Sequence, residues 1–196
     1  MNKLSVIENI NILPVAKMNY GWSGKTLDIE FEEPLDSNTT YALILGTEYT
    51  DIRNNKPSQS FSLIFSTGAT IDSGNINGKL YNPKPEGAYI YAYKITSINP
   101  DTLNPLTTKP NYKIQVGSSG NFTIPALKDG RYRLFAVRDK FKDGIYNEGL
   151  DEYGSPISDV DVVNGKSPKV LIKLGPTIDS QKPILYEAEA ISNKRI

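Results

Sequence analysis

Apolar and polar residues alternate along most of this chain, which is the pattern of strands buried on one face. Leu27, Ile29 and Phe31 alternate with Asp28 and Glu30. The same period of two returns in two later runs, at Tyr41, Leu43 and Leu45 and at Phe61, Leu63 and Phe65. Turn-forming residues separate the runs at 23–24, 34–37 and 54–57. We therefore predict short antiparallel strands in the first third of the chain.

The pattern then continues from residue 76 to residue 174. The strand runs contain Ile76, Gly78, Leu80, Ala88, Ile90, Ala92, Tyr112, Ile114, Val116, Phe122, Ile124, Tyr132, Leu134, Ala136, Val160, Val162, Val163, Val170, Ile172 and Leu174, and of these Phe122, Ile124, Tyr132, Leu134 and Ala136 are expected to face a core. A polar loop at 139–159 interrupts these runs. We therefore expect a second set of antiparallel strands after the first.

The fold class predicted from this pattern is all-β, with two tandem antiparallel β-sandwich domains. No stretch has the 3.6-residue apolar period of a helix, and 13 prolines and 15 glycines punctuate the chain. Small and polar residues at 67–74 predict a linker, which divides the chain into domains at 1–70 and 71–176. Residues 177–196 contain a second predicted linker, at 177–183, and then a predicted strand over Leu185 to Ile191.

Charge and hydropathy exclude two classes of partner. The 22 basic residues balance the 22 acidic ones, so net charge gives no reason to expect binding to nucleic acid. No apolar run reaches the roughly 18–20 residues that cross a bilayer, so we expect no membrane insertion.

The chain contains neither cysteine nor histidine. Their absence removes thiol chemistry, the Ser-His-Asp triad and the commonest ligands of zinc. The carboxylate pairs near Glu30 and at Asp151-Glu152 lie in solvated stretches, where no cleft is expected between them. We therefore expect a protein that is not an enzyme and that needs no cofactor, calcium apart.

Two groups of residues are candidates for binding. Tyr89, Tyr91 and Tyr93 recur on one face of a predicted strand, where they would form a stacking platform for a sugar or a peptide, or would pack against a neighbouring module.

The second candidate is the acidic loop around Asp139, Asp143 and Asp151, which could hold calcium. Asp139, Asp143 and the glycine that follows match positions one, five and six of an EF-hand loop. Phe141 and Leu150, however, occupy positions that need oxygen ligands. The alternative is a loop whose carboxylates cap turns.

The first domain resembles the bacterial Ig-like domain of surface-layer proteins. That family has an L-x-x-x-T-x-Y segment, a D-x-x-x-N turn and an F-S-T-G strand. The matching residues here are Leu35, Thr39, Thr40 and Tyr41, then Asp51 with Asn54-Asn55, then the run 61–68. The resemblance implies that the domain (about 4–68) is incomplete, since a strand pair would precede Leu4.

The second domain resembles the carboxypeptidase-regulatory-like and collagen-adhesin B-type domains, which are prealbumin-like sandwiches. Their G-x-F-x-I-x-x-L-x-x-G-x-Y core is present here as Gly120, Phe122, Ile124, Leu127, Gly130 and Tyr132. This resemblance covers about residues 74–175.

Together the resemblances imply a non-catalytic structural or adhesive module pair, from a larger exported bacterial surface or secreted protein. The alternative is a carbohydrate- or protein-binding accessory segment of a secreted multidomain enzyme. The expected location is extracellular or at the cell surface. The expected partners are neighbouring modules of the parent chain, with a glycan or a protein as ligand.

An incomplete first sheet would leave an unpaired edge. We expect that edge to allow self-association, and the segment 182–190 to be the opening strand of a following Ig-like module that could add to such a sheet.

Overall fold

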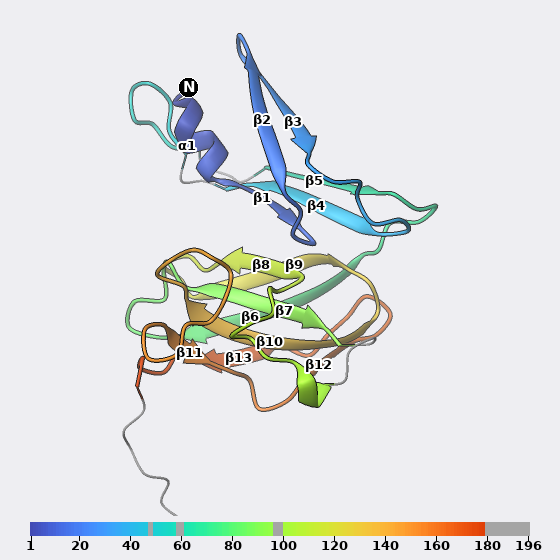
Figure 1. Cartoon of the computed structure of the whole chain (residues 1–196), viewed down its shortest axis with the longest axis vertical. Helices are drawn as coiled ribbons and strands as arrows, with labels where there is room; N and C mark the ends of the chain where they lie inside the picture. Colours follow the sequence, from blue (N-terminus) through green and yellow to red (C-terminus); the bar gives the residue numbers. More distant parts are fainter. Residues whose placement is uncertain (47–48, 58–60, 96–99, 179–196) are drawn as a thin grey trace, which may run out of the picture.

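The computed structural model describes residues 1–46, 49–57, 61–95 and 100–178. Nearly all regular structure in this part of the chain is β, which confirms the predicted fold class (Figure 1). The N-terminal region (residues 1–70) contains α1 (Lys3–Glu8), β1 (Ile10–Leu13), β2 (Met18–Ser23), β3 (Thr26–Phe31), β4 (Thr40–Leu45) and β5 (Phe61–Ser66). The sandwich (residues 74–175) contains β6 (Gly74–Tyr81), β7 (Tyr89–Lys94), the 3-10 turn η1 (Pro100–Thr102), β8 (Tyr112–Gln115), β9 (Asn121–Leu127), β10 (Gly130–Arg138), β11 (Glu152–Gly154), β12 (Val160–Val162) and β13 (Val170–Lys173).

The short helix α1 is a difference from the all-strand expectation. Its first turn is capped by Asn2, whose side-chain oxygen accepts from the N–H of Ser5 at 3.3 Å. At its other end the Asn9 side chain donates to the carbonyl of Ser5 at 2.8 Å. A helix of six residues is too short to show a 3.6-residue period, so hydropathy alone could not reveal it.

Two small antiparallel sheets build the rest of the N-terminal region. One has the order β1-β4-β5, and the other is the hairpin β2-β3, with its turn at Gly24. The strands predicted at β3, β4 and β5 are therefore confirmed, whereas β1 and β2 were not predicted, and the apolar faces of the strands are covered unequally. Phe61 is 61% exposed and Leu63 is 49% exposed, because both lie on the edge strand β5.

The sandwich has two sheets that face one another across a hydrophobic core. One sheet has the order β11-β10-β7-β8, with β12 also paired to β10, and the other has the order β13-β6-β9. All pairings are antiparallel except that of β13 with β6, which is parallel and differs from the expectation. The strand β11 was missed by the sequence pattern because only three residues of the loop 139–159 form it.

The residues predicted to face the core do so. Leu134 and Ala136 on β10 are buried together with Phe122, Ile90 and Ala92, whereas Val163, at the end of its run, is 60% exposed. Gly78 is needed here because a Cβ at this position would collide with the Phe122 ring. The opposite face of the same two strands is also covered, by a second cluster around Tyr91 and Phe135.

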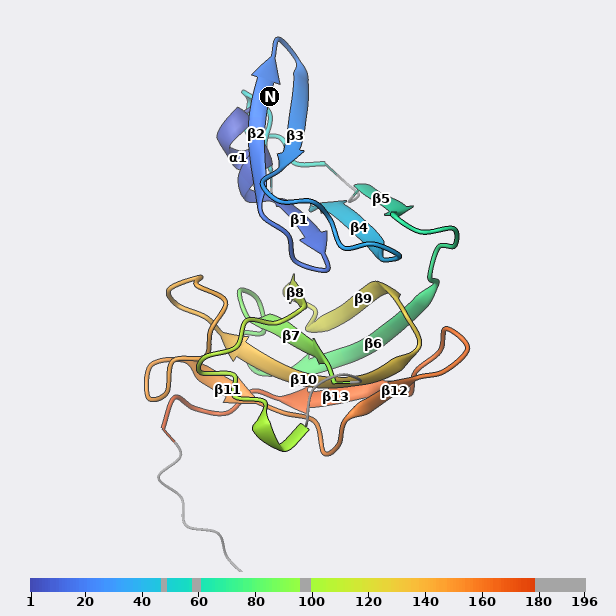
Figure 2. The same ribbon diagram turned by 45° about the vertical axis from the view of Figure 1, so that its right-hand side comes forward.

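The N-terminal sheet packs on the edge of the sandwich (Figure 2). Strand β4 lies against β9 and β1 lies against β8. Leu13 and Ala42, both completely buried, belong to the same hydrophobic cluster as the sandwich core. The N–H of Val15 also donates to the carbonyl of Asn111 at 2.7 Å. The core therefore continues from one region into the other.

The linker predicted at 67–74 is held in place. Thr67 donates its N–H to the carbonyl of Thr39 at 3.0 Å, and Asp72 donates its N–H to the hydroxyl of Thr40 at 2.8 Å. The predicted strand over Leu185 to Ile191 lies outside the described residues. Among the helices that the structure describes, none is long and apolar enough to span a bilayer.

Candidate functional site

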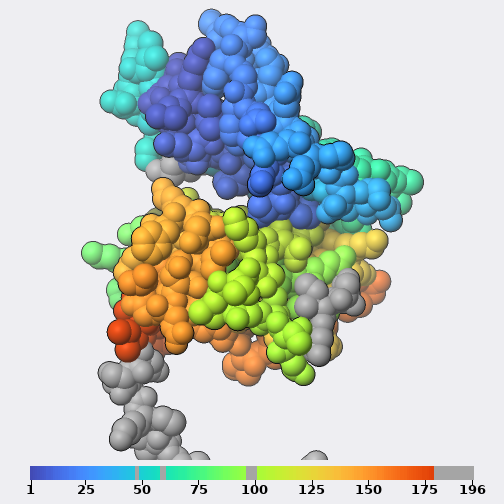
Figure 3. All heavy atoms as spheres, in the orientation of Figure 1, coloured from blue at the N-terminus to red at the C-terminus, as the bar shows by residue number. Residues whose placement is uncertain are grey.

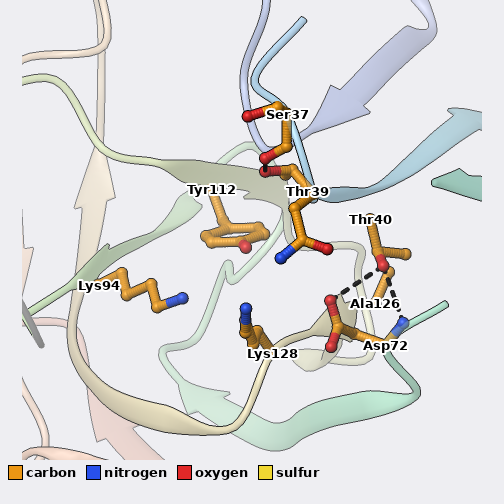
Figure 4. Close-up of a pocket in the computed structure, with 9 residues that line it drawn as sticks. Ser37, Thr39, Thr40, Asp72, Lys94, Tyr112, Ala126 and Lys128 are labelled. Carbon is orange, nitrogen blue, oxygen red and sulfur yellow. Dashed lines mark hydrogen bonds between the residues drawn. The ribbon is translucent and has the colours of Figure 1, made fainter. Parts of the chain in front are cut away.

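A polar pocket of about 280 Å³ lies where the N-terminal region meets the sandwich (Figure 4). We call it the junction pocket. Its lining comes from the loop before β4, from the linker and from the sandwich strands β7, β8 and β9: Ser37, Asn38, Thr39, Thr40, Asp72, Lys94, Tyr112, Ala126 and Lys128. Both regions contribute side chains, so the pocket exists only in the packed arrangement.

The N-terminal wall of the junction pocket is fixed by hydrogen bonds between the loop 36–40 and the linker. The Thr40 hydroxyl donates to Asp72 Oδ2 at 2.9 Å. The Thr67 hydroxyl donates to the carbonyl of Asp36 at 2.6 Å and accepts from the N–H of Thr39 at 3.0 Å. The glycine of the F-S-T-G run, Gly68, lies so close to Asn38 that a Cβ would meet the Asn38 Cα at 2.9 Å. A larger residue at Gly68 would therefore push this wall away.

Two lysines of the sandwich reach into the pocket. Lys94 ends β7, and Lys128 stands in the turn between β9 and β10. In Figure 4 their amino groups point toward one another beneath the ring of Tyr112. Burial lowers the pKa of Lys94, the nearby charge of Lys128 lowers it further, and Asp72 opposes both effects. The pocket thus holds two like charges side by side.

Tyr112 forms the back of the pocket. It is 5% exposed and packs edge-on against Tyr132, with ring centroids 6.0 Å apart. Burial raises the pKa of Tyr112 to about 12, so the phenol remains protonated at neutral pH. The hydroxyl of Tyr132 donates to the carbonyl of Lys128 at 2.7 Å, which fixes the turn that carries this lysine. The lining can offer ammonium groups, hydroxyls and one carboxylate to a ligand.

The tyrosine row does not form an open stacking platform, which corrects that expectation. Tyr91 and Tyr93 are 0% and 1% exposed, and only Tyr89 remains half-buried. The segments 100–111 and 139–151 cover them and lie side by side on this face (Figure 3), joined by a hydrogen bond from Tyr146 N to the carbonyl of Pro105 at 3.1 Å. Alternation placed these rings on the face opposite Ile90 but could not show that loops cover that face.

Asp139 is buried beneath the same loops and is the centre of a small polar cluster. Its Oδ2 atom accepts from the Tyr91 hydroxyl at 2.6 Å, from Lys113 Nζ at 2.9 Å and from Gly144 N at 3.0 Å. Burial by itself would raise the pKa of Asp139, but the hydrogen bonds from Tyr91, Lys113 and Gly144 outweigh it and hold that pKa below its usual value. Lys113 Nζ also lies 4.3 Å from the centroid of the Tyr89 ring.

The other two predicted calcium ligands serve turns of the loop. Asp151 is completely buried and accepts from the N–H groups of Lys140 and Asn147 at 3.1 and 2.9 Å. Asp143 is exposed and accepts from the N–H of Ile145 at 2.9 Å.

The fit of these residues to calcium is poor. One observation favours a metal: Asp139 Oδ1 is buried with no hydrogen-bond partner and could therefore accept a cation. The Lys113 ammonium, however, already neutralises this carboxylate, and no group of three potential ligands occurs among the described residues. Asp143 and Asp151 therefore cap turns of the loop and Asp139 anchors the polar cluster, while calcium binding stays a prediction.

Sequence reasoning missed the junction pocket. Asp72, Lys94 and Lys128 are separated by more than twenty residues from one another and lie in no recognisable motif. The first resemblance did include residues of the pocket wall, because Thr39, Thr40 and Gly68 belong to its motif and shape that wall.

No protein-family model matches this chain, and no curated protein matches it. Among solved structures, the pilus adhesin RrgA from Streptococcus pneumoniae is similar over 78% of this chain, with 20% sequence identity and a TM-score of 0.34. The matched part is 22% of the adhesin chain, so this chain spans about a fifth of its length. At that TM-score the likeness supports no argument about function.

Proposed function

We propose that the chain is a non-catalytic structural or adhesive module pair of an exported protein, and that it works by holding its two regions as one rigid body. The observation that carries this proposal is the continuous core. Leu13, Ala42 and the sandwich residues form one hydrophobic cluster, in which Leu13 is completely buried. A rigid body presents its surface in a fixed geometry, which lowers the entropy lost when a partner binds.

The alternative function, a carbohydrate- or protein-binding accessory segment, is favoured by a different observation. The junction pocket has a volume of about 280 Å³, near the lower end of the range of small-molecule sites, and its lining is polar. The two functions are compatible, because an adhesive module also needs a binding surface.

Rigidity can be tested by urea unfolding followed with two probes. Trp22 is the single tryptophan and reports on the N-terminal region, whereas near-ultraviolet circular dichroism reports mainly on the buried tyrosines of the sandwich. For a single rigid body the two probes give the same midpoint. Two widely separated transitions in the unmodified chain would overturn the proposal.

Leu13→Ala sharpens this experiment. It removes a completely buried side chain from the junction, so we expect a loss of about 2–5 kcal/mol and a Trp22 transition that precedes the tyrosine transition. The matched control is Leu63→Ala, which truncates a leucine that is 49% exposed in the same region and should leave the two transitions coincident.

A further inference from the structure

The junction pocket contains two lysines and one carboxylate, so its positive charge is only partly balanced by Asp72. Neither Lys94 nor Lys128 forms an ion pair with any of the described residues, although other basic side chains of the sandwich, such as Arg131 and Lys113, do. Burial and Lys128 both lower the pKa of Lys94, and Asp72 offsets them only in part, so its ammonium form is less stable in the pocket than in water. An anionic group between the two ammonium ions would remove that penalty and gain charge-assisted hydrogen bonds.

The remaining lining narrows the kind of anion. Asp72 lies on the side of the pocket next to Thr40, away from Lys94 (Figure 4). Its Oδ2 accepts from the Thr40 hydroxyl, while its Oδ1 has no hydrogen-bond donor in the described part of the chain. A carboxylate in this position repels additional negative charge but accepts hydrogen bonds from hydroxyl groups. The pocket therefore favours a singly charged carboxylate with neighbouring hydroxyls over a phosphate with two charges.

The backbone around the pocket supports a dedicated site. Asn38 and Ala126 line it with φ angles of 51° and 59°, in the left-handed region. Asparagine tolerates this conformation, but alanine adopts it at a cost, and Ala126 does so at the irregularity in the pairing of β9 with β6. Strained residues of this kind persist where the surrounding structure fixes them, and they gather at binding sites.

From these observations we infer that the junction pocket binds an acidic sugar unit, with the carboxylate between Lys94 and Lys128 and a hydroxyl on Asp72. This inference rests on the proposed adhesive function, since it names the ligand class of such a module. Two sources share the chemistry, a uronic acid of a polysaccharide and a terminal sialic acid, and the volume of about 280 Å³ suits one sugar unit of either.

The test is titration calorimetry of the full chain with trigalacturonate and with sialyllactose, using maltotriose and inorganic phosphate as comparison ligands. Binding of one acidic saccharide, with weaker or absent binding of maltotriose and phosphate, supports the inference. The saccharide that binds more tightly identifies the source. Phosphate binding tighter than both acidic saccharides would overturn it, and so would maltotriose binding as tightly as they do.

Two lysine variants locate the site. Lys94→Gln and Lys128→Gln should each weaken binding of the acidic saccharide by roughly tenfold or more, because each removes a charge-assisted contact. The matched control is Lys169→Gln, an exposed lysine away from the pocket, which should leave the affinity unchanged. Equal affinities in all three variants would sink the inference.

The acidic-sugar ligand and the rigid module are tested by different measurements. If no acidic saccharide binds while Trp22 and the tyrosines still unfold together, the ligand class is wrong and the rigid module stands. If the two probes give different unfolding midpoints in the unmodified chain, the proposal of a rigid module is wrong. Binding that depends on Lys94 and Lys128 would then still support the ligand class.

Discussion

The two regions of this molecule use the same alternating pattern with different results. In the sandwich, four successive residues of β7, from Ile90 to Tyr93, are buried, because the second sheet covers one face and two loops cover the other. In the N-terminal region, the first four residues of β5, from Phe61 to Ile64, are exposed. Period-two alternation predicts a strand in both cases, but burial depends on what the fold places opposite it.

The difference follows from the number of strands available. The sandwich closes a core between sheets of five and three strands, whereas the N-terminal region has a three-stranded sheet and a separate two-stranded hairpin. A two-stranded hairpin buries little surface by itself. Of the five buried apolar residues that the structure describes in the N-terminal region (Val6, Ile12, Leu13, Tyr41 and Ala42), Leu13 and Ala42 are buried in the cluster that it shares with the sandwich.

Truncating one leucine in each region should expose this contrast most strongly. Leu134→Ala in β10 removes a side chain that is 1% exposed and should cost about 2–5 kcal/mol of unfolding free energy. Leu63→Ala in β5 should cost under about 1 kcal/mol, because half of that side chain is already in water. Urea unfolding measures both. Equal losses would show that the N-terminal region is as well packed as the sandwich.

A pair of glycine substitutions separates backbone strain from packing. Gly120 and Gly24 both have positive φ, at 73° and 60°, so alanine costs about 1–2 kcal/mol of backbone strain at either position. At Gly120 the added Cβ would also meet the carbonyl oxygen of Leu80 at 2.5 Å, whereas nothing lies within 4 Å at Gly24. Thermal unfolding should therefore show the larger loss for Gly120→Ala. The reverse order would mean that the hairpin, not the sandwich, is the tighter environment.

The smallest expected effect is the contribution of two loop aspartates, Asp139 and Asp51, to the pH dependence of folding stability. Hydrogen bonds lower the pKa of Asp139 in the sandwich, against its burial, and those from Asn55 and Arg53 lower that of Asp51 in the N-terminal region. A folded-state pKa below the unfolded value of about 3.9 gives stability that is present above that value and lost as the pH falls through the folded pKa.

Asp139→Asn should therefore flatten the acid side of the stability profile, measured as melting temperature between about pH 5 and pH 2. Asp51→Asn should flatten it less, because Asp51 lies in an open loop, whereas Asp139 is 4% exposed and paired with Lys113. If Asp139→Asn leaves the acid side unchanged, the polar cluster under the tyrosines does not contribute to stability through its charge.

Much of the fold could be predicted from the sequence, and little of the site. The strands around Ile29, Leu80, Ile124 and Leu134 were each predicted from alternation, because period two is a local property of the chain. The helix α1 and the strand β11 were not, because six and three residues are too few to show a period. The tyrosine row was assigned to the correct strand and face, but its burial depends on loops that come later in the sequence.

The sequence by itself determined that this chain is all-β, that it lacks the histidine and cysteine on which much enzyme chemistry relies, and which face of most strands is apolar. Each of these follows from residue type and local spacing. The tertiary structure alone decided which apolar faces are covered, that β13 runs parallel to β6, and that Lys94 and Lys128 share a pocket with Thr40 and Asp72. Those outcomes depend on contacts between residues that are far apart in the chain, and neither the hydrophobic period nor the composition gives information about such contacts.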